Sequence, residues 1–235
     1  MTLRAIEPSQ QTAARVAGLL YLLTNITAMF GFYARVHPIV SGDAVQTARN
    51  IVASERLFRI GVVMELTTVA GVIILIVCLY SILKDIHPTL ALVALSWRIA
   101  EDAILAVITL TEFAVLVLLS GADFLRAVDA RQLQALAYAL LRVDGAGFNV
   151  GFVFLGLGST LFSYLWFQPR YIPRVIAAWG MFASSLMASV TLAMMVFPAL
   201  SALGLTYMAP MGIYEFTLGF WLLVKGIRRD DATNR

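Results

Sequence analysis

The chain has 235 residues, of which 60% are hydrophobic and only 13% are charged. Because an ordinary soluble domain is roughly half apolar and about a quarter charged, this composition argues against a water-soluble fold. The net charge of +3 comes from basic residues that are dispersed rather than gathered on one face, so we expect no nucleic-acid partner.

Long apolar runs dominate the chain, and each approaches the ~20 residues that an α-helix needs to cross a membrane. We expect an all-α polytopic membrane bundle of about six transmembrane helices, which together form a single transmembrane domain. The predicted spans cover residues 13–33, 58–83, 90–119, 146–167, 175–197 and 203–224.

Two shorter segments are predicted to lie along the membrane surface. Residues 44–54 follow a polar turn and are typical of a short interfacial helix. Residues 131–142 repeat leucines at helical spacing opposite Arg131, as in an amphipathic helix. Asp144 and Gly145 are then expected to turn the chain into the fourth span.

The positions of Lys and Arg beside the spans predict the orientation, because these residues favour the cytoplasmic side. If both termini lie in the cytoplasm, more Lys and Arg residues lie inside than outside. The inner set comprises Arg4, Arg15, Lys84, Arg170, Arg174, Lys225, Arg228, Arg229 and Arg235, and the outer set comprises Arg35, Arg49, Arg56, Arg126, Arg131 and Arg142.

Charged groups inside the spans are the main functional signal, because each costs about 3 kcal/mol at the bilayer centre unless it is paired, hydrated or neutralised. Asn25 and Asn149 could join the same polar layers through hydrogen bonds between helices. The charged candidates are Arg59 and Glu65 of the second span, Arg98, Glu101, Asp102 and Glu112 of the third, and Glu215 of the sixth.

The spacing of these residues predicts two polar layers. Arg98 and Glu215 each lie roughly 12–15 Å from the inner ends of their helices, so they could pair across the bundle. Glu101 and Asp102 follow Arg98 by three and four positions, which places them on the same helix face. The second layer, nearer the outer surface, comprises Arg59, Glu65 and Glu112.

Five carboxylates thus face two arginines in a low-dielectric space, so some of them should hold a proton or meet a cation. One hypothesis is a cavity that binds or transports a small amphipathic or cationic ligand or a proton. Another hypothesis is an intramembrane enzyme that acts on a lipid or isoprenoid, with Glu101, Asp102 or Glu215 as the catalytic acid. Its pocket would be apolar and would include Trp97 and Phe113. A third hypothesis is a structural subunit in which the charges only fix helix packing.

No cofactor and no metal site are predicted. The sequence contains no HExxH, GxSxG or GxxxxGK[ST] motif, and its only cysteine is Cys78. His37 and His87 are expected at opposite membrane ends, which argues against a shared haem.

Gly147 and Gly151 form a small-xxx-small pair in the fourth span. Such pairs let helix backbones approach closely. The pair therefore favours close packing within the bundle, with a homodimer as the alternative.

Four short motifs connect the chain with a known family. They are residues 14–22 (ARVAGLLYL), 53–59 (ASERLFR), 79–80 (LY) and 97–101 (WRIAE). With these motifs the chain resembles the bacterial integral membrane family catalogued as domain of unknown function 4386, from about residue 12 to 227. The resemblance implies a polytopic protein of the bacterial plasma membrane, with membrane lipid as its surroundings, and it assigns no activity. It makes Arg15, Glu55, Arg59, Arg98 and Glu101 the positions worth testing.

Overall fold

The computed structural model describes residues 7–168 and 170–228, and within these ranges the chain forms helices and no strand. Arg4, Arg229 and Arg235, which contributed to the predicted orientation, lie outside the described residues. The long helices are α1 (Pro8–Val36), α3 (Glu55–Leu83), α4 (Pro88–Leu118), α5 (Ala130–Phe167), α6 (Arg174–Val196) and α7 (Ala209–Lys225); the short ones are α2 (Ala44–Ala53) and the 3-10 turns η1 (Asp123–Leu125), η2 (Pro198–Leu203) and η3 (Thr206–Met208).

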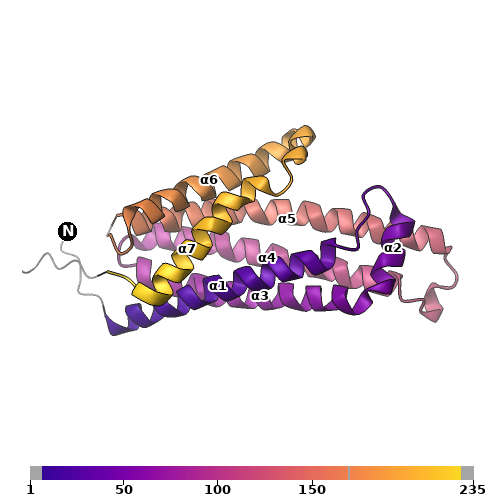
Figure 1. The fold of residues 1–235 in the computed structure, drawn as a ribbon, viewed down its shortest axis with the longest axis horizontal. Helices are drawn as coiled ribbons and strands as arrows, with labels where there is room; N and C mark the ends of the chain where they lie inside the picture. Colours follow the sequence, from indigo (N-terminus) through magenta and orange to yellow (C-terminus); the bar gives the residue numbers. More distant parts are fainter. Residues whose placement is uncertain (1–6, 169, 229–235) are drawn as a thin grey trace, which may run out of the picture.

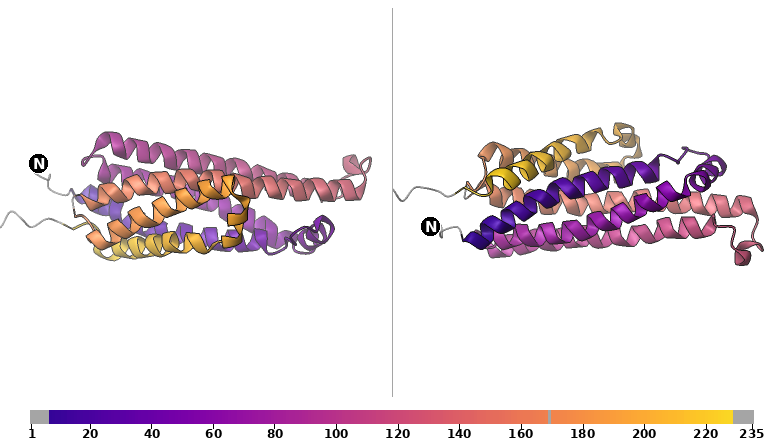
Figure 2. Two further views of the ribbon diagram at one scale, coloured as in Figure 1. Left: turned by 90° about the horizontal axis from the view of Figure 1, so that it is seen from above. Right: turned by 60° about the horizontal axis from the view of Figure 1, so that its bottom comes forward.

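Contacts between successive neighbours close the six long helices into a ring. Figure 1 shows this bundle from the side. Helix α1 packs against α3 and α7, α4 packs between α3 and α5, and α6 closes the ring between α5 and α7. We call the end where α1 begins and α7 ends the terminal end, and the end with α2 and η1 the distal end. Figure 2 shows that α6 and α7 cover only the terminal part of the bundle, whereas α5 continues far beyond them.

Glycines set the closest helix contacts in the ring. A Cβ atom on Gly18 of α1 would lie 2.4 Å from the backbone nitrogen of Leu223 in α7. A Cβ atom on Gly156 of α5 would lie 2.7 Å from the carbonyl oxygen of Ser184 in α6. Such backbone approaches are common between membrane helices, because small residues there maximise van der Waals contact.

Four of these helices are long and apolar enough to cross a membrane by length and composition, namely α1, α3, α5 and α6. Helix α7 has only 17 residues. Helix α4 carries Arg98, Glu101, Asp102 and Glu112 along its length, and all four side chains are buried. The number of helices with an apolar span is therefore smaller than the six that the hydrophobic runs predict.

The structure differs from the sequence interpretation between residues 131 and 167. Instead of a surface helix, a turn and a separate span, the chain forms the single 38-residue helix α5. Asp144 and Gly145 lie inside it and do not break it. A helical glycine costs only about 1 kcal/mol relative to alanine, and the contacts of α5 with α4 and α6 outweigh that cost.

The last helix also begins later than the predicted residue 203. Residues 198–208 form the turns η2 and η3 instead, and Gly204 between them has a φ of 55°. That backbone angle favours glycine and interrupts helical geometry. As a result α6 and α7 are joined by a tip of 3-10 turns. Helix α6 runs from the terminal end to this tip, and α7 returns from the tip to the terminal end (Figure 1).

Candidate functional site

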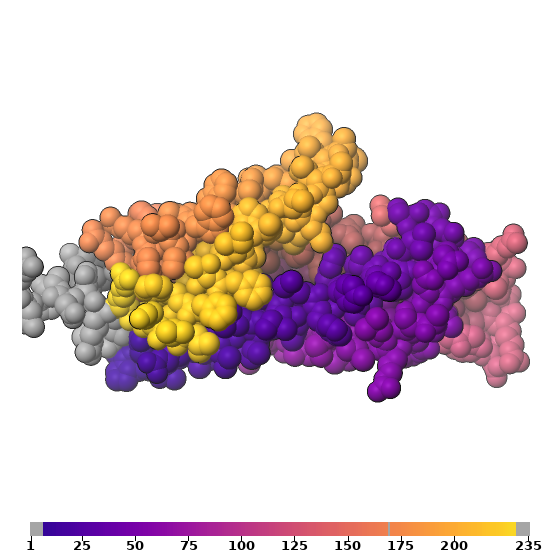
Figure 3. Space-filling view, in the orientation of Figure 1, coloured from indigo at the N-terminus to yellow at the C-terminus, as the bar shows by residue number. Residues whose placement is uncertain are grey.

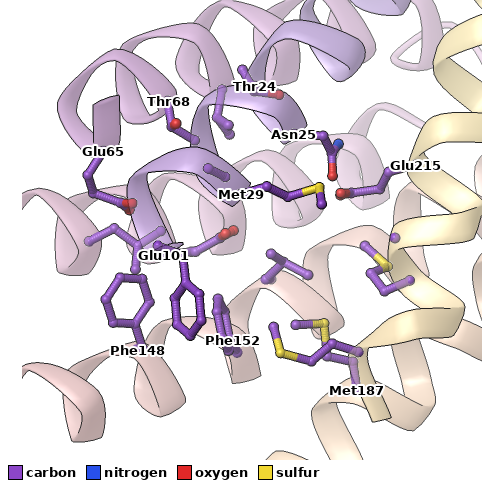
Figure 4. A pocket seen from close by; sticks show the side chains of 18 of the residues that line it. Thr24, Asn25, Met29, Glu65, Thr68, Glu101, Phe148, Phe152, Met187 and Glu215 are labelled. Atoms are coloured by element: carbon purple, nitrogen blue, oxygen red, sulfur yellow. The ribbon is translucent and has the colours of Figure 1, made fainter. Parts of the chain in front are cut away.

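A cavity of about 420 Å³ lies inside the helix ring. Its lining draws on all six long helices and on residues that precede α7, so side chains far apart in the sequence face one space (Figure 4). The ionisable groups of the lining are Arg35 of α1, Glu65 of α3, Arg98, Glu101 and Asp102 of α4, and Glu215 of α7.

Arg98 and Glu101, which the sequence places on one helix face, form an ion pair in the structure. Its Nη1 and Oε2 atoms lie 2.7 Å apart, and the two side chains are 5% and 3% exposed. Within the described residues neither atom has an aligned hydrogen-bond partner, so charge rather than a directed hydrogen bond holds the contact. Arg98 pairs along its own helix here, and not across the bundle with Glu215.

Asp102 is the least satisfied group of the site. It is buried, and neither carboxyl oxygen has a hydrogen-bond partner in the part of the chain that the structure describes. An unsatisfied buried polar group costs about 1–3 kcal/mol, and more if it is charged. Asp102 is therefore the side chain in this cavity with most to gain from a proton or a ligand.

Glu215 faces the cavity from α7 and meets Asn25 of α1. Figure 4 shows the two side chains turned toward each other. The Asn25 Nδ2 atom donates to the carbonyl oxygen of Tyr21 at 2.9 Å, which fixes the orientation of the amide. Glu215 is half-buried rather than buried because it borders the open space of the cavity.

A second polar layer lies toward the distal end and is centred on Arg35. The Arg35 Nη2 atom lies 2.8 Å from Oε2 of Glu65, Nη1 donates to Glu112, and Nε donates to the carbonyl oxygen of Gly31 at 3.1 Å. The guanidinium carbon lies 5.2 Å from the centre of the Phe148 ring in α5. We call Arg35, Glu65 and Glu112 the Arg35 cluster; with Phe148 it links α1, α3, α4 and α5.

The structure corrects the predicted position of Arg59. Its side chain is 52% exposed and pairs with Glu55 one turn earlier on α3, at 2.7 Å. Arg35 occupies the place between Glu65 and Glu112 that the sequence interpretation gave to Arg59. The reason is the length of α1, which continues to Val36 and so keeps Arg35 inside the bundle instead of in an outer loop. Asp144 of α5, which was interpreted as a turn residue, also lies within electrostatic reach of Arg35.

Several predicted residues do not contribute to the cavity lining. Asn149 is half-buried on α5 and Glu112 lies behind the lining, where it contacts Arg35. Trp97 and Phe113, whose presence was expected for an acid-catalysed enzyme, are not lining residues either. Those two positions give the enzyme hypothesis no support.

The glycine pair of the fourth predicted span faces α4 of the same chain. A Cβ atom on Gly147 would lie 2.4 Å from Ile108, and one on Gly151 would lie 3.3 Å from Leu105. The pair thus permits the close contact of α4 and α5 that positions Glu101 and Asp102.

Apart from Tyr21, Thr24, Asn25 and Thr68, the rest of the lining is apolar and adaptable. Met29, Met187, Met208 and Met211 contribute flexible thioether side chains from three helices and from η3. Phe148 and Phe152 contribute aromatic rings whose centres are 5.7 Å apart. Methionine adapts to ligands of different shapes, and aromatic rings attract organic cations. The apolar wall and the carboxyl groups together suit a ligand that is both apolar and positively charged.

The charges of the lining are unbalanced. Four carboxyl groups face two guanidinium groups, so full ionisation would leave an excess of two negative charges. Burying uncompensated charge is costly, because the attraction within ion pairs only just offsets the loss of hydration. Protonation of some of these carboxyl groups, or a bound cation, would remove this excess.

Aromatic and basic residues gather at the terminal end. The Arg174 guanidinium lies 5.3 Å from the Phe167 ring centre, and that of Arg228 lies 4.7 Å from the centre of a Trp221 ring. Burial raises the pKa of the Tyr171 phenol in the loop before α6, and the carboxylate of Asp85 adds to the shift. Such a belt is typical of a membrane–water interface.

The comparison with protein families gives one match. The family model described as "Domain of unknown function (DUF4386)" matches residues 16–226. The chain belongs to this family. No curated protein and no solved structure matches the chain. Family membership is thus established over nearly the whole length of the chain.

Proposed function

We propose that this family member is a six-span membrane protein whose cavity binds a small amphipathic cation. The observation that carries the proposal is the lining, where an excess of carboxyl groups lies beside an apolar wall of methionine and aromatic side chains. The carboxylates would stabilise the positive charge of the ligand, and the wall would bury its apolar groups.

The ring arrangement supports six spans instead of four. Helix α4 packs between α3 and α5, and α7 packs between α1 and α6. All four of these neighbours are long and apolar enough to cross a membrane. If they cross it, α4 and α7 cross it as well, with the charges of α4 directed into the ring.

Asp102 and Glu215 are the proposed counter-ions for the ligand. Asp102 has two carboxyl oxygens without a partner among the described residues, whereas Glu101 already faces Arg98. Glu215 borders the open space and has Asn25 beside it. In the absence of a ligand, protons would neutralise part of this acid excess. Ligand binding would then release protons, which is the exchange that a proton-coupled transporter or sensor needs.

Binding of tetraphenylphosphonium to the purified protein in lipid nanodiscs tests the proposal. This probe has apolar phenyl groups and a permanent positive charge. Because the probe does not titrate, any effect of pH on binding arises from the protein. We expect saturable binding that exceeds partitioning into empty nanodiscs. Replacing one counter-ion by Asp102→Asn or Glu215→Gln should weaken binding at least about tenfold, a loss of ~1.4 kcal/mol.

The matched control is Asp123→Asn, which also removes one carboxylate at nearly constant volume. Asp123 lies in η1, its side chain is 86% exposed, and it is remote from the cavity lining. Wild-type affinity is expected for this control. Unchanged affinity of both cavity variants, or binding no greater than in empty nanodiscs, would refute the proposed function.

A further inference from the structure

The cavity opens sideways through the wall of the ring, between α1 and the segment that precedes α7. Met29 and Leu205 both line the cavity and are 64% and 54% exposed, so they lie where the lining reaches the surface. Figure 3 shows a hollow there, between the tip that joins α6 to α7 and the surface of α1. We call this opening, bordered by Met29, Leu205 and Gly212, the lateral mouth.

The lateral mouth lies at the depth of the lipid chains. At 1.5 Å per residue, the 23 residues of α6 reach about 35 Å from the terminal end to the tip, compared with a hydrocarbon core of ~30 Å. Gly212 precedes the end of α7 by 13 residues, or about 20 Å. The mouth therefore lies between the two ends of α6, within the hydrocarbon core.

The surface around the mouth is apolar. Three apolar residues beside it are exposed, namely Ile26 (58%), Phe30 (43%) and Ile213 (58%). In a membrane such a surface contacts lipid and not water. A ligand that passes through this opening must therefore be soluble in lipid.

The Arg35 cluster obstructs the alternative route from the distal end. Arg35 is only 4% exposed and is held by carboxylates of α3 and α4 and by the Phe148 ring of α5. Opening this route would separate a buried ion cluster, which is energetically expensive. The lateral mouth requires no such rearrangement.

The mouth leads directly to a proposed counter-ion. Met29 lies four residues after Asn25 on α1, and Gly212 lies three residues before Glu215 on α7. Residues at these helical spacings are neighbours on one face. A cation whose apolar part remains in the mouth could thus place its charge one helical turn deeper, beside Glu215.

We propose that the ligand reaches the cavity laterally from the hydrocarbon core of the membrane, so that it belongs to the class of amphipathic cations that partition into lipid. The inference rests on the proposed function for the existence of a cationic ligand, and adds the route and the physical class. It predicts that an obstacle at the mouth slows binding although every charge of the cavity is retained.

Gly212→Trp provides this obstacle. A Cβ atom at Gly212 has no heavy atom within 4 Å among the described residues, so the larger side chain can extend into the mouth without disturbing the packing. Gly145→Trp is the matched control, because Gly145 has the same open surroundings and lies on α5 away from the lining. We expect Gly212→Trp to slow tetraphenylphosphonium association about tenfold or more. A wild-type rate in Gly212→Trp would overturn the lateral route.

Thiol labelling tests the route without a ligand. Because Cys78 is the only cysteine, Cys78→Ala gives a cysteine-free background. In that background Met29→Cys, labelled with a nitroxide in detergent and then reconstituted into lipid, should be relaxed by oxygen and shielded from a water-soluble nickel chelate, whereas the same label at Asp123→Cys should be relaxed by the chelate. Equal relaxation by the chelate at both positions would show a water-filled mouth and overturn the inference. Failure of the wild-type protein to bind the cation would instead refute the proposed function.

Discussion

Removal of the Arg35 guanidinium should be among the most damaging single charge changes in this protein. Arg35→Gln would leave Glu65 and Glu112 without their cation, and the side chains in these contacts are at most 5% exposed. Breaking a buried ion pair by deleting one partner costs about 3–5 kcal/mol. The comparable pair of Arg59 and Glu55 is 52% and 48% exposed, and such pairs contribute less than about 1 kcal/mol.

Thermal unfolding of Arg35→Gln and Arg59→Gln, measured side by side in the same detergent, tests this difference. At ~2–4 °C per kcal/mol for a chain of this size, Arg35→Gln should lower Tm by roughly 6–20 °C. Arg59→Gln should change it by less than about 4 °C. The triple variant Arg35→Gln with Glu65→Gln and Glu112→Gln should recover part of the loss, because no uncompensated charge remains. Equal stability of the two single variants would refute the assignment of Arg35 to a buried cluster.

Three further predictions concern packing, protons and topology. Gly156→Val should lower the free energy of unfolding by about 1–3 kcal/mol, because its side chain would collide with the α6 backbone at Ser184. Gly145→Ala, whose side chain would lie in open space, should not lower the stability of the protein. Tetraphenylphosphonium affinity should fall as the pH is lowered, because protonated carboxyl groups no longer attract the cation; a pH-independent affinity would exclude the acid excess as its cause. In the cysteine-free background, a membrane-impermeant maleimide should label Asp123→Cys on intact cells and Lys84→Cys only after lysis, as six spans with both termini inside require; labelling of both on intact cells would contradict this topology.

Much of the fold could be predicted because hydrophobic length is a direct signal. The expected helices at 58–83, 90–119 and 175–197 differ from α3, α4 and α6 by at most three residues at either end. The continuity of α5 could not be predicted, since a polar residue followed by glycine is a usual turn signal. Only the packing of α5 against α4 and α6 decides the outcome.

The candidate site was predicted in part. Glu65, Glu101, Asp102 and Glu215 all line the cavity, because carboxyl groups within apolar helices must face one another and not lipid. Arg35 was missed, since it follows the apolar run and therefore was interpreted as a loop residue. A signal was present in the sequence: Ala14, Tyr21, Ala28 and Arg35 recur every seven residues along one face of α1, which would have extended the inward face to Arg35.

The most direct test of the account is a crystal structure of the protein with tetraphenylarsonium, grown from a lipidic phase. This cation has the shape of the phosphonium probe, and the anomalous scattering of its arsenic atom would locate the charge. We expect a single strong anomalous peak inside the helix ring, between Asp102 and Glu215 and adjacent to the lateral mouth. A peak only at the outer surface of the protein, or a cavity without one at a saturating concentration of the cation, would contradict it.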